Sequence, residues 1–369
     1  MKGIISFIKK ILIIFFITLL LIEITSFFFI KFNLISAGLP SWVTQYAHKD
    51  YAVWHPKNTT FKKIESKGCW VSNITYNNFG MRGMNDVSLL KSKKRIALLG
   101  DSMIENIELS DGKDVGSLIA KKLKDYEILN FSARGTGLAD QKNIYEKLIK
   151  KFDVDYLFLF IHPNDFINNS INGNGKLYNR RFDVINNTVV EIPKDLIWME
   201  NYNSKFKKLS REYSIYFKDY NSYKIYLFFR NFFKNKEVVR KNTNIEKKNL
   251  YIDYFEKNKT IYKYLKKEFS NAIDPKVKFH VILNLQPYFF LENEKLNKEE
   301  FFIKYNLIPF FDQIWSDYFF VNPIYDAKRI IYKNNYKIPY FSWTCGDQHY
   351  NEKGSEFISD LVVKTIIKK

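Results

Sequence analysis

A serine at the end of a short apolar run is the first residue of this sequence that could carry covalent chemistry. Ser102 closes a Gly-Asp-Ser tripeptide that directly follows the run Arg95–Leu99. A serine hydroxyl is a weak nucleophile at neutral pH and needs a neighbouring base to take its proton. His349 could supply that base, because an unperturbed imidazole has a pKa of about 6.5, and Asp347 could orient its ring. The pattern indicates nucleophilic catalysis, although a lone Gly-Asp-Ser is common in turns.

Two further polar turns, each preceded by an apolar run, lie between these two ends of the chain. Gly135 lies in a Gly-Thr-Gly turn after the run Tyr126–Leu129, and Asn164 follows the run Asp155–Ile161. The carboxyl ends of strands in an open parallel sheet line one crevice. We therefore expect both turns to converge on Ser102.

Taken in order, these four segments resemble the sequence blocks of the SGNH (GDSL-like) hydrolase superfamily, over about residues 91–369. The resemblance implies an α/β fold with a three-layer α/β/α (flavodoxin-like) parallel sheet. It also implies Ser102 as nucleophile, His349 as base and Asp347 as the partner of that base. The spacing Asp347-x-His349 is one residue shorter than the usual Asp-x-x-His, and relatives that act on bacterial polysaccharides look similar to this shorter form.

The resemblance further implies an oxyanion hole, whose donors are the backbone N–H of Ser102, the backbone N–H of Gly135 and the side-chain amide of Asn164. Glycine at 135 allows close backbone approach. His162 stands where the family usually has the glycine of Gly-x-Asn-Asp. Two interpretations of His162 stay open: a pocket-lining side chain that contacts substrate, or a histidine bonded to neighbouring backbone.

The N-terminal region contains an apolar run at residues 11–30 whose only charge is Glu23. Twenty such residues in a helix cover about 30 Å, the thickness of the hydrocarbon core. Lysines are more frequent before the run than after it, which predicts a cytoplasmic tail at residues 1–10 and an extracytoplasmic remainder. The alternative is a cleaved signal peptide cut near Ser36–Gly38, but the run exceeds the usual 7–15 apolar residues.

Residues 31–90 are too rich in aromatic side chains for a flexible linker, so we expect a connector that packs on the catalytic domain. Its segment Asn77–Gly83 reads Asn-x-x-Gly-x-Arg-Gly and looks like that of membrane-anchored SGNH proteins of bacterial envelopes. Arg82 could contact substrate, or it could bond backbone carbonyls as a structural arginine.

Alternating strand and helix patterns predict a parallel sheet with helices on both faces. The pattern stops over an insertion at about 170–275, where a hairpin with the turn Asn186–Asn187 precedes a helical cap over 205–270. The predicted strands are 95–99, 126–130, 155–161, 277–286 and 338–341, and the predicted helices lie near 112–124, near 138–151 and from 352 onward.

The composition limits the partners. The net charge is +19, from 58 basic and 39 acidic residues. Such a surface could favour anionic lipid headgroups or acidic polysaccharide, whereas no zinc-finger or RNA-binding signature accompanies it, which disfavours nucleic acid. The two cysteines, Cys69 and Cys345, could pair in an oxidising compartment or stay as buried thiols. No metal site and no cofactor are expected.

Together these features favour a membrane-anchored, periplasmic or otherwise extracytoplasmic ester hydrolase or O-acyltransferase, acting on acyl groups such as O-acetyl of an envelope glycan. Such an enzyme could work with a membrane acyltransferase. Two alternatives stay open: a non-catalytic glycan-binding or envelope-assembly protein, since fold does not fix function, and a lipase or thioesterase.

Overall fold

A computed structural model describes ten segments of the chain. They are residues 2–31, 44–64, 70–162, 164–171, 179–193, 199–200, 203–204, 247–284, 309–334 and 349–367.

The N-terminal helix α1 spans Lys2–Lys31. Its stretch Phe7–Phe29 is long and apolar enough to cross a membrane, although a signal sequence at this place would have the same properties. The helix begins earlier than the predicted span of 11–30, so most of the predicted tail at 1–10 is helical. Apolar side chains along α1 are exposed, as a lipid-facing helix requires.

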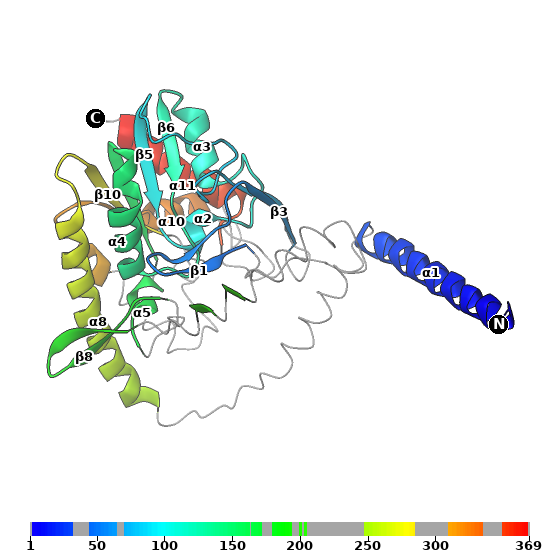
Figure 1. Cartoon of the computed structure of the whole chain (residues 1–369). Helices are drawn as coiled ribbons and strands as arrows, with labels where there is room; N and C mark the ends of the chain where they lie inside the picture. The colour runs from blue at the N-terminus through cyan, green and yellow to red at the C-terminus, as the bar shows by residue number, and fades with distance from the viewer. Residues whose placement is uncertain are drawn as a thin grey trace.

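A five-stranded, fully parallel sheet forms the centre of the α/β domain (Figure 1). The strand order is β11-β10-β7-β5-β6. Read from the β6 edge, with the five strands numbered along the chain, this is the 2-1-3-4-5 order of flavodoxin-like folds, which confirms the predicted fold class. The strands are β5 (Lys94–Leu99), β6 (Tyr126–Asn130), β7 (Tyr156–Ile161), β10 (Lys278–Leu283) and β11 (Phe319–Val321).

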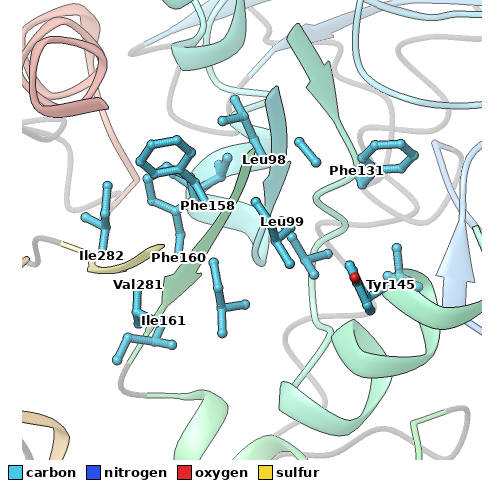
Figure 2. Packing of buried hydrophobic residues seen from close by; sticks show 14 of the residues in the cluster. Leu98, Leu99, Phe131, Tyr145, Phe158, Phe160, Ile161, Val281 and Ile282 are labelled. Carbon is cyan, nitrogen blue, oxygen red and sulfur yellow. The ribbon is translucent and has the colours of Figure 1, made fainter. Parts of the chain in front are cut away.

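The central strands are apolar because they are covered on both faces. All six residues of β7 are buried, and five of the six in β5 are buried. Phe158 lies opposite Leu98 on one side and His280 on the other. Figure 2 shows side chains of β5, β7 and β10 packed in one cluster. The sheet therefore gives the strand ends a rigid base.

Helices cover the sheet in two layers (Figure 1). Helix α3 packs against α11, and α4 packs against α8. The long helices are α3 (Val115–Lys122), α4 (Leu138–Lys147), α8 (Lys247–Ala272), α10 (Ile324–Lys333) and α11 (Glu352–Ile367), and the short ones are α2 (Ser102–Glu105), the 3₁₀ helix η2 (Ile149–Phe152) and α5 (Asp165–Asn168).

Short antiparallel pairs flank the sheet. The connector contributes β1 (Tyr46–His48) paired with β2 (Ala52–Trp54), and β3 (Thr59–Ile64) paired with β4 (Val71–Tyr76). Its Trp54 is only 3% exposed and belongs to the main core, so the connector packs on the domain as expected.

The predicted hairpin is present as β8 (Arg181–Ile185) and β9 (Thr188–Ile192). Its turn residues Asn186 and Asn187 have φ of 49° and 60°, the positive values that a two-residue type I′ turn needs.

The insertion differs from the prediction in its last part. Residues 247–272 form α8, which buries Ile261, Leu265 and Phe269 in the main core. This helix is thus a layer of the fold that connects β7 to β10, rather than part of a cap. The predicted helical region at 205–246, the strand at 338–341 and both cysteines lie outside the described residues.

Candidate active site

Ser102 lies where β5 ends and the short helix α2 begins. The preceding Asp101 caps this helix, since its Oδ1 accepts from the Met103 N–H at 3.0 Å. Asn106 ends it in the left-handed conformation, with φ of 50°. Ser102 is half-buried, whereas the residues on either side of it are buried. The local sequence therefore presents the hydroxyl at the carboxyl edge of the sheet.

His349 meets Ser102 across the fold. The Nε2 atom of His349 lies 2.9 Å from the Oγ atom of Ser102, although the residues are 247 positions apart. This is the contact that a serine nucleophile and its base require. The sequence-based pairing of the two residues is thus matched by the geometry.

The other ring nitrogen of His349 faces a carboxylate that the sequence did not single out. Its Nδ1 lies 3.4 Å from Oε1 of Glu108, and the Glu108 side chain is only 2% exposed. Asp347, the expected partner, lies outside the described residues. Within the described part of the chain, Glu108 is the carboxylate that the structure places against the base.

Arg134 lies between two buried carboxylates. Its Nη2 donates to Oε1 of Glu108 at 2.9 Å, its backbone N–H donates to Oε2 of Glu105 at 2.7 Å, and its Nε lies 3.7 Å from the same oxygen. Burial lowers the pKa of Arg134, but the charges of Glu108 and Glu105 outweigh it and hold the pKa above its usual range. The guanidinium therefore stays charged between Glu105 and Glu108.

Glu105 joins Arg134 to side chains of the connector, residues 31–90. It is fully buried and accepts from the Tyr76 hydroxyl at 2.6 Å, and its Oε1 lies 3.1 Å from Nε2 of His55. Burial raises the pKa of Glu105, yet the nearby His55 and Arg134 and the Tyr76 hydrogen bond bring it well below the usual range. His55 is fully buried, with Nδ1 3.0 Å from the Gly80 carbonyl oxygen.

The Gly135 turn is fastened to the Ser102 strand end. The Ala133 N–H and the Thr136 hydroxyl lie 3.2 and 3.4 Å from the Gly100 carbonyl oxygen. Gly135 itself has φ of +76°, a left-handed conformation that favours glycine. The turn therefore lies beside Ser102, as the order of the strands predicted.

Asn164 lies at the end of β7, next to the same turn. It precedes α5, whose Asn168 side chain donates to the Thr136 carbonyl oxygen at 3.2 Å. The Asn164 Oδ1 atom is buried and has no hydrogen-bond partner among the described residues. The structure thus brings the expected oxyanion segments of Ser102, Gly135 and Asn164 to one edge of the sheet.

His162 and Asp165 brace the turn before Asn164. The Nδ1 atom of His162 accepts from the Asn164 N–H at 3.1 Å, while the His162 N–H donates to Asp165 at 2.9 Å. His162 is only 8% exposed. Of the two interpretations, the bond to neighbouring backbone is the one that the structure shows. Burial, and then the charge of Asp101, raises the pKa of Asp165 well above its usual range.

Arg82 is a structural residue in the same network. Its guanidinium is buried and donates to the carbonyl oxygens of Glu105, Asn106 and Leu109 at 3.3, 3.2 and 2.7 Å. It also lies 3.3 Å from Asp111. The proposed substrate contact is therefore corrected, because these carbonyls hold Arg82 beneath the segment that follows Ser102.

The segment that carries His349 is tied to the same loop. The Asn106 side chain donates to the Tyr350 carbonyl oxygen at 3.1 Å and accepts from the Ser355 hydroxyl at 2.7 Å. The Tyr350 hydroxyl donates to Asn284, at the end of β10, at 3.1 Å. These bonds hold the residue next to His349 from two sides.

The sequence contained a weak signal for the residues that it missed. Glu105 and Glu108 alternate with Ile104, Ile107 and Leu109 directly after the serine, so two carboxylates stand in an apolar, buried stretch. Buried carboxylates need cationic partners. In the described residues, no group of three or more histidine, cysteine, aspartate or glutamate side chains could hold a metal ion.

Comparisons with known proteins add little to this geometry. No protein-family model matches the chain. No curated protein matches it either. Solved structures with similar folds include the acetyl xylan esterase AlAXEase (13% identity, TM-score 0.38, covering 74% of this chain and 99% of the other). A catalytic mutant of Axe2, an acetylxylan esterase from Geobacillus stearothermophilus, has 13% identity and a TM-score of 0.39, with 76% and 96% covered.

A third is a lipase/acylhydrolase from Enterococcus faecalis, at 11% identity and a TM-score of 0.36, with 74% and 95% covered. These neighbours are esterases and acylhydrolases, but likeness at this level carries no argument about the activity of this chain. The functional argument therefore depends on the site itself.

Proposed function

We propose that this protein is a serine-dependent ester hydrolase or O-acyltransferase that works through an acyl-Ser102 intermediate. The observation that carries the proposal is the 2.9 Å contact between Ser102 Oγ and His349 Nε2, with the buried Glu108 behind the histidine. A protein that only binds ligand has no need of an activated hydroxyl.

The residues define the steps of the reaction. His349 takes the proton of Ser102 as the serine oxygen attacks the acyl carbonyl carbon. The carbonyl oxygen becomes an oxyanion, for which the N–H groups of Ser102 and Gly135 and the Asn164 amide are the proposed donors. As the carbonyl re-forms, the bond to the alcohol breaks and His349 returns the proton to the leaving oxygen.

The second half of the reaction decides between the two activities. Water or a second hydroxyl attacks the acyl-serine, with His349 again as base, and the regenerated Ser102 leaves with the proton. Water gives hydrolysis, and a sugar hydroxyl gives transfer. We propose an O-acetylated envelope glycan as the substrate, because α1 would hold the domain at a membrane surface and the net charge of +19 favours acidic polymers.

The test uses the full-length protein in detergent micelles. It should hydrolyse an aryl acetate faster than longer aryl esters, and a fluorophosphonate should label Ser102. Ser102→Ala should abolish both, whereas Ser110→Ala, which alters a serine bonded to the Asn73 N–H, should leave both unchanged. Labelling elsewhere, or full activity of Ser102→Ala, would refute the mechanism. A chito-oligosaccharide acceptor separates the two activities, since a transferase forms acetylated sugar at the expense of free acetate.

A further inference from the structure

Glu108 is a buried carboxylate at the centre of the site, and the proposed steps do not use it. It lies six positions after Ser102, in the loop that follows α2. Its Oε1 faces two cationic or proton-bearing groups, Arg134 Nη2 at 2.9 Å and His349 Nδ1 at 3.4 Å. Its Oε2 is buried without a hydrogen-bond partner among the described residues. Burying such a charge is costly unless it is paired with cationic or hydrogen-bonding groups.

The position of Glu108 is fixed by the residues on both sides of it. The Ser72 hydroxyl donates to the Ile107 carbonyl oxygen at 2.5 Å, and Arg82 donates to the Leu109 carbonyl oxygen at 2.7 Å. The loop is also joined to the His349 segment, because Asn106 donates to the Tyr350 carbonyl oxygen. The carboxylate and the imidazole are therefore held in one rigid assembly.

Two successive contacts join three groups in a row: Ser102 Oγ, the His349 ring and Glu108 Oε1. A carboxylate 3.4 Å from Nδ1 favours the tautomer with the proton on Nδ1, which leaves the lone pair of Nε2 directed at the serine hydroxyl. When the proton moves from Ser102 to Nε2, the ring becomes an imidazolium cation, and the carboxylate at 3.4 Å stabilises it. The ion pair with Arg134 holds Oε1 in place during this step.

We propose that Glu108 is the positioning residue of the catalytic base: it fixes the tautomer of His349 and stabilises its protonated form. This inference rests on the proposed acyl-serine function. Asp347, which the family resemblance implied for this role, lies outside the described residues. The role belongs to a residue on the nucleophile's own loop, so base and nucleophile share one support.

The charges around His349 set the expected pH effect. Glu108 faces the ring directly, Arg134 lies behind Glu108, and Glu105 lies on the far side of Arg134. On α11, the described neighbour is Glu352, which is 61% exposed and paired with Lys113. An opposite charge within about 4–6 Å raises the pKa of a cation by roughly 1–3 units. Removal of the Glu108 charge should therefore make His349 a weaker base.

The experiment measures kcat and KM for an aryl acetate against pH, together with the rate of fluorophosphonate labelling, for the full-length protein in micelles. We expect Glu108→Gln to lower the midpoint of the acidic limb by about one pH unit or more. It should also lower kcat by about 100-fold, the lower end of general acid–base contributions, with little change in KM. Glu352→Gln is the matched control and should keep the wild-type midpoint.

A conservative variant covers the case in which Glu108→Gln does not fold. Glu108→Asp keeps the charge but shortens the side chain, so it should keep the wild-type midpoint while kcat falls. Wild-type kcat in Glu108→Asp, or an unchanged midpoint in Glu108→Gln, overturns the proposal. A lowered midpoint in Asp347→Asn with none in Glu108→Gln returns the role to Asp347. Wild-type protein that is labelled at another serine refutes the proposed function instead.

Discussion

Replacement of Gly80 by alanine should weaken the contact between the connector and the active site. Gly80 has φ of +76°, and an added Cβ would lie 2.5 Å from the His55 carbonyl oxygen and 2.8 Å from Nε1 of Trp54. Neither neighbour can retreat freely, because Trp54 Nε1 donates to the Phe79 carbonyl oxygen at 2.8 Å. The His55 ring also contacts the Gly80 carbonyl oxygen at 3.0 Å.

The magnitude follows from two separate costs. A left-handed conformation costs alanine about 1–2 kcal/mol, of which about 0.4–1 kcal/mol is offset because alanine restricts the unfolded chain. Forcing a methyl group into a filled site costs about 1–3 kcal/mol. We therefore expect Gly80→Ala to lower the free energy of unfolding by about 2–4 kcal/mol, which is roughly 5–15 °C in Tm for a domain of this size.

Gly112→Ala is the matched control. Gly112 has φ of +85°, but its added Cβ would meet only Nζ of Lys121, at the ordinary contact distance of 3.7 Å. Gly112→Ala has the cost of the left-handed backbone but no steric clash, so it should lower the free energy of unfolding by only about 1 kcal/mol. Urea unfolding followed by tryptophan fluorescence measures both variants. Equal losses of stability in the two variants would show that His55 and Trp54 do not pack against Gly80 as described.

Three further predictions concern the site and the anchor. Asn164→Ala should lower turnover of an aryl acetate by about 10²–10³-fold with an unchanged circular dichroism spectrum, and a smaller loss would remove its amide from the oxyanion hole. Glu105→Gln should cost about 3–5 kcal/mol at neutral pH, because it leaves buried cations uncompensated. Folding lowers the pKa of Glu105, so this contribution is present above the unfolded pKa of about 4.3 and is lost as pH falls through the folded value. Urea unfolding should therefore show a smaller difference in unfolding free energy between wild type and variant below pH 4 than at pH 7, and an equal difference would contradict the ion pairing. Protease added to intact spheroplasts should degrade the domain that carries Ser102, and survival of the domain until lysis would reverse the proposed orientation.

The sequence predicted the centre of the sheet well because the central strands β5 and β7 are buried on both faces. β7 stands out as a continuous apolar run, and the Asn186–Asn187 turn has residues that tolerate positive φ. Strand β11 is only three residues long, too short to show a period, and it was not predicted. The connector strands β1 and β2 are equally short and were missed for the same reason, while β3 and β4, with six residues each, were not predicted either.

The site was predictable where a residue type is tied to one chemical role. Ser102 and His349 could be paired because a nucleophile needs a base, and the strand order brings their segments together. Glu108 could not be found in this way, because a glutamate near a serine is ordinary and only the fold shows which way it points. The role of Arg82 was also undecided, since one guanidinium can bind substrate or carbonyls equally well.

The ties between Asn106 and the C-terminal segment have a consequence for synthesis of the protein. Asn106 contacts Tyr350 and Ser355, which are 244 and 249 positions later in the chain. During synthesis, His349 therefore follows 247 positions after the serine, and its tether comes with it. Until α11 docks on α3, Ser102 has no base and Glu108 has no ring to orient. The proposed activity therefore requires that the segment carrying His349 has been synthesised and that the whole domain has folded.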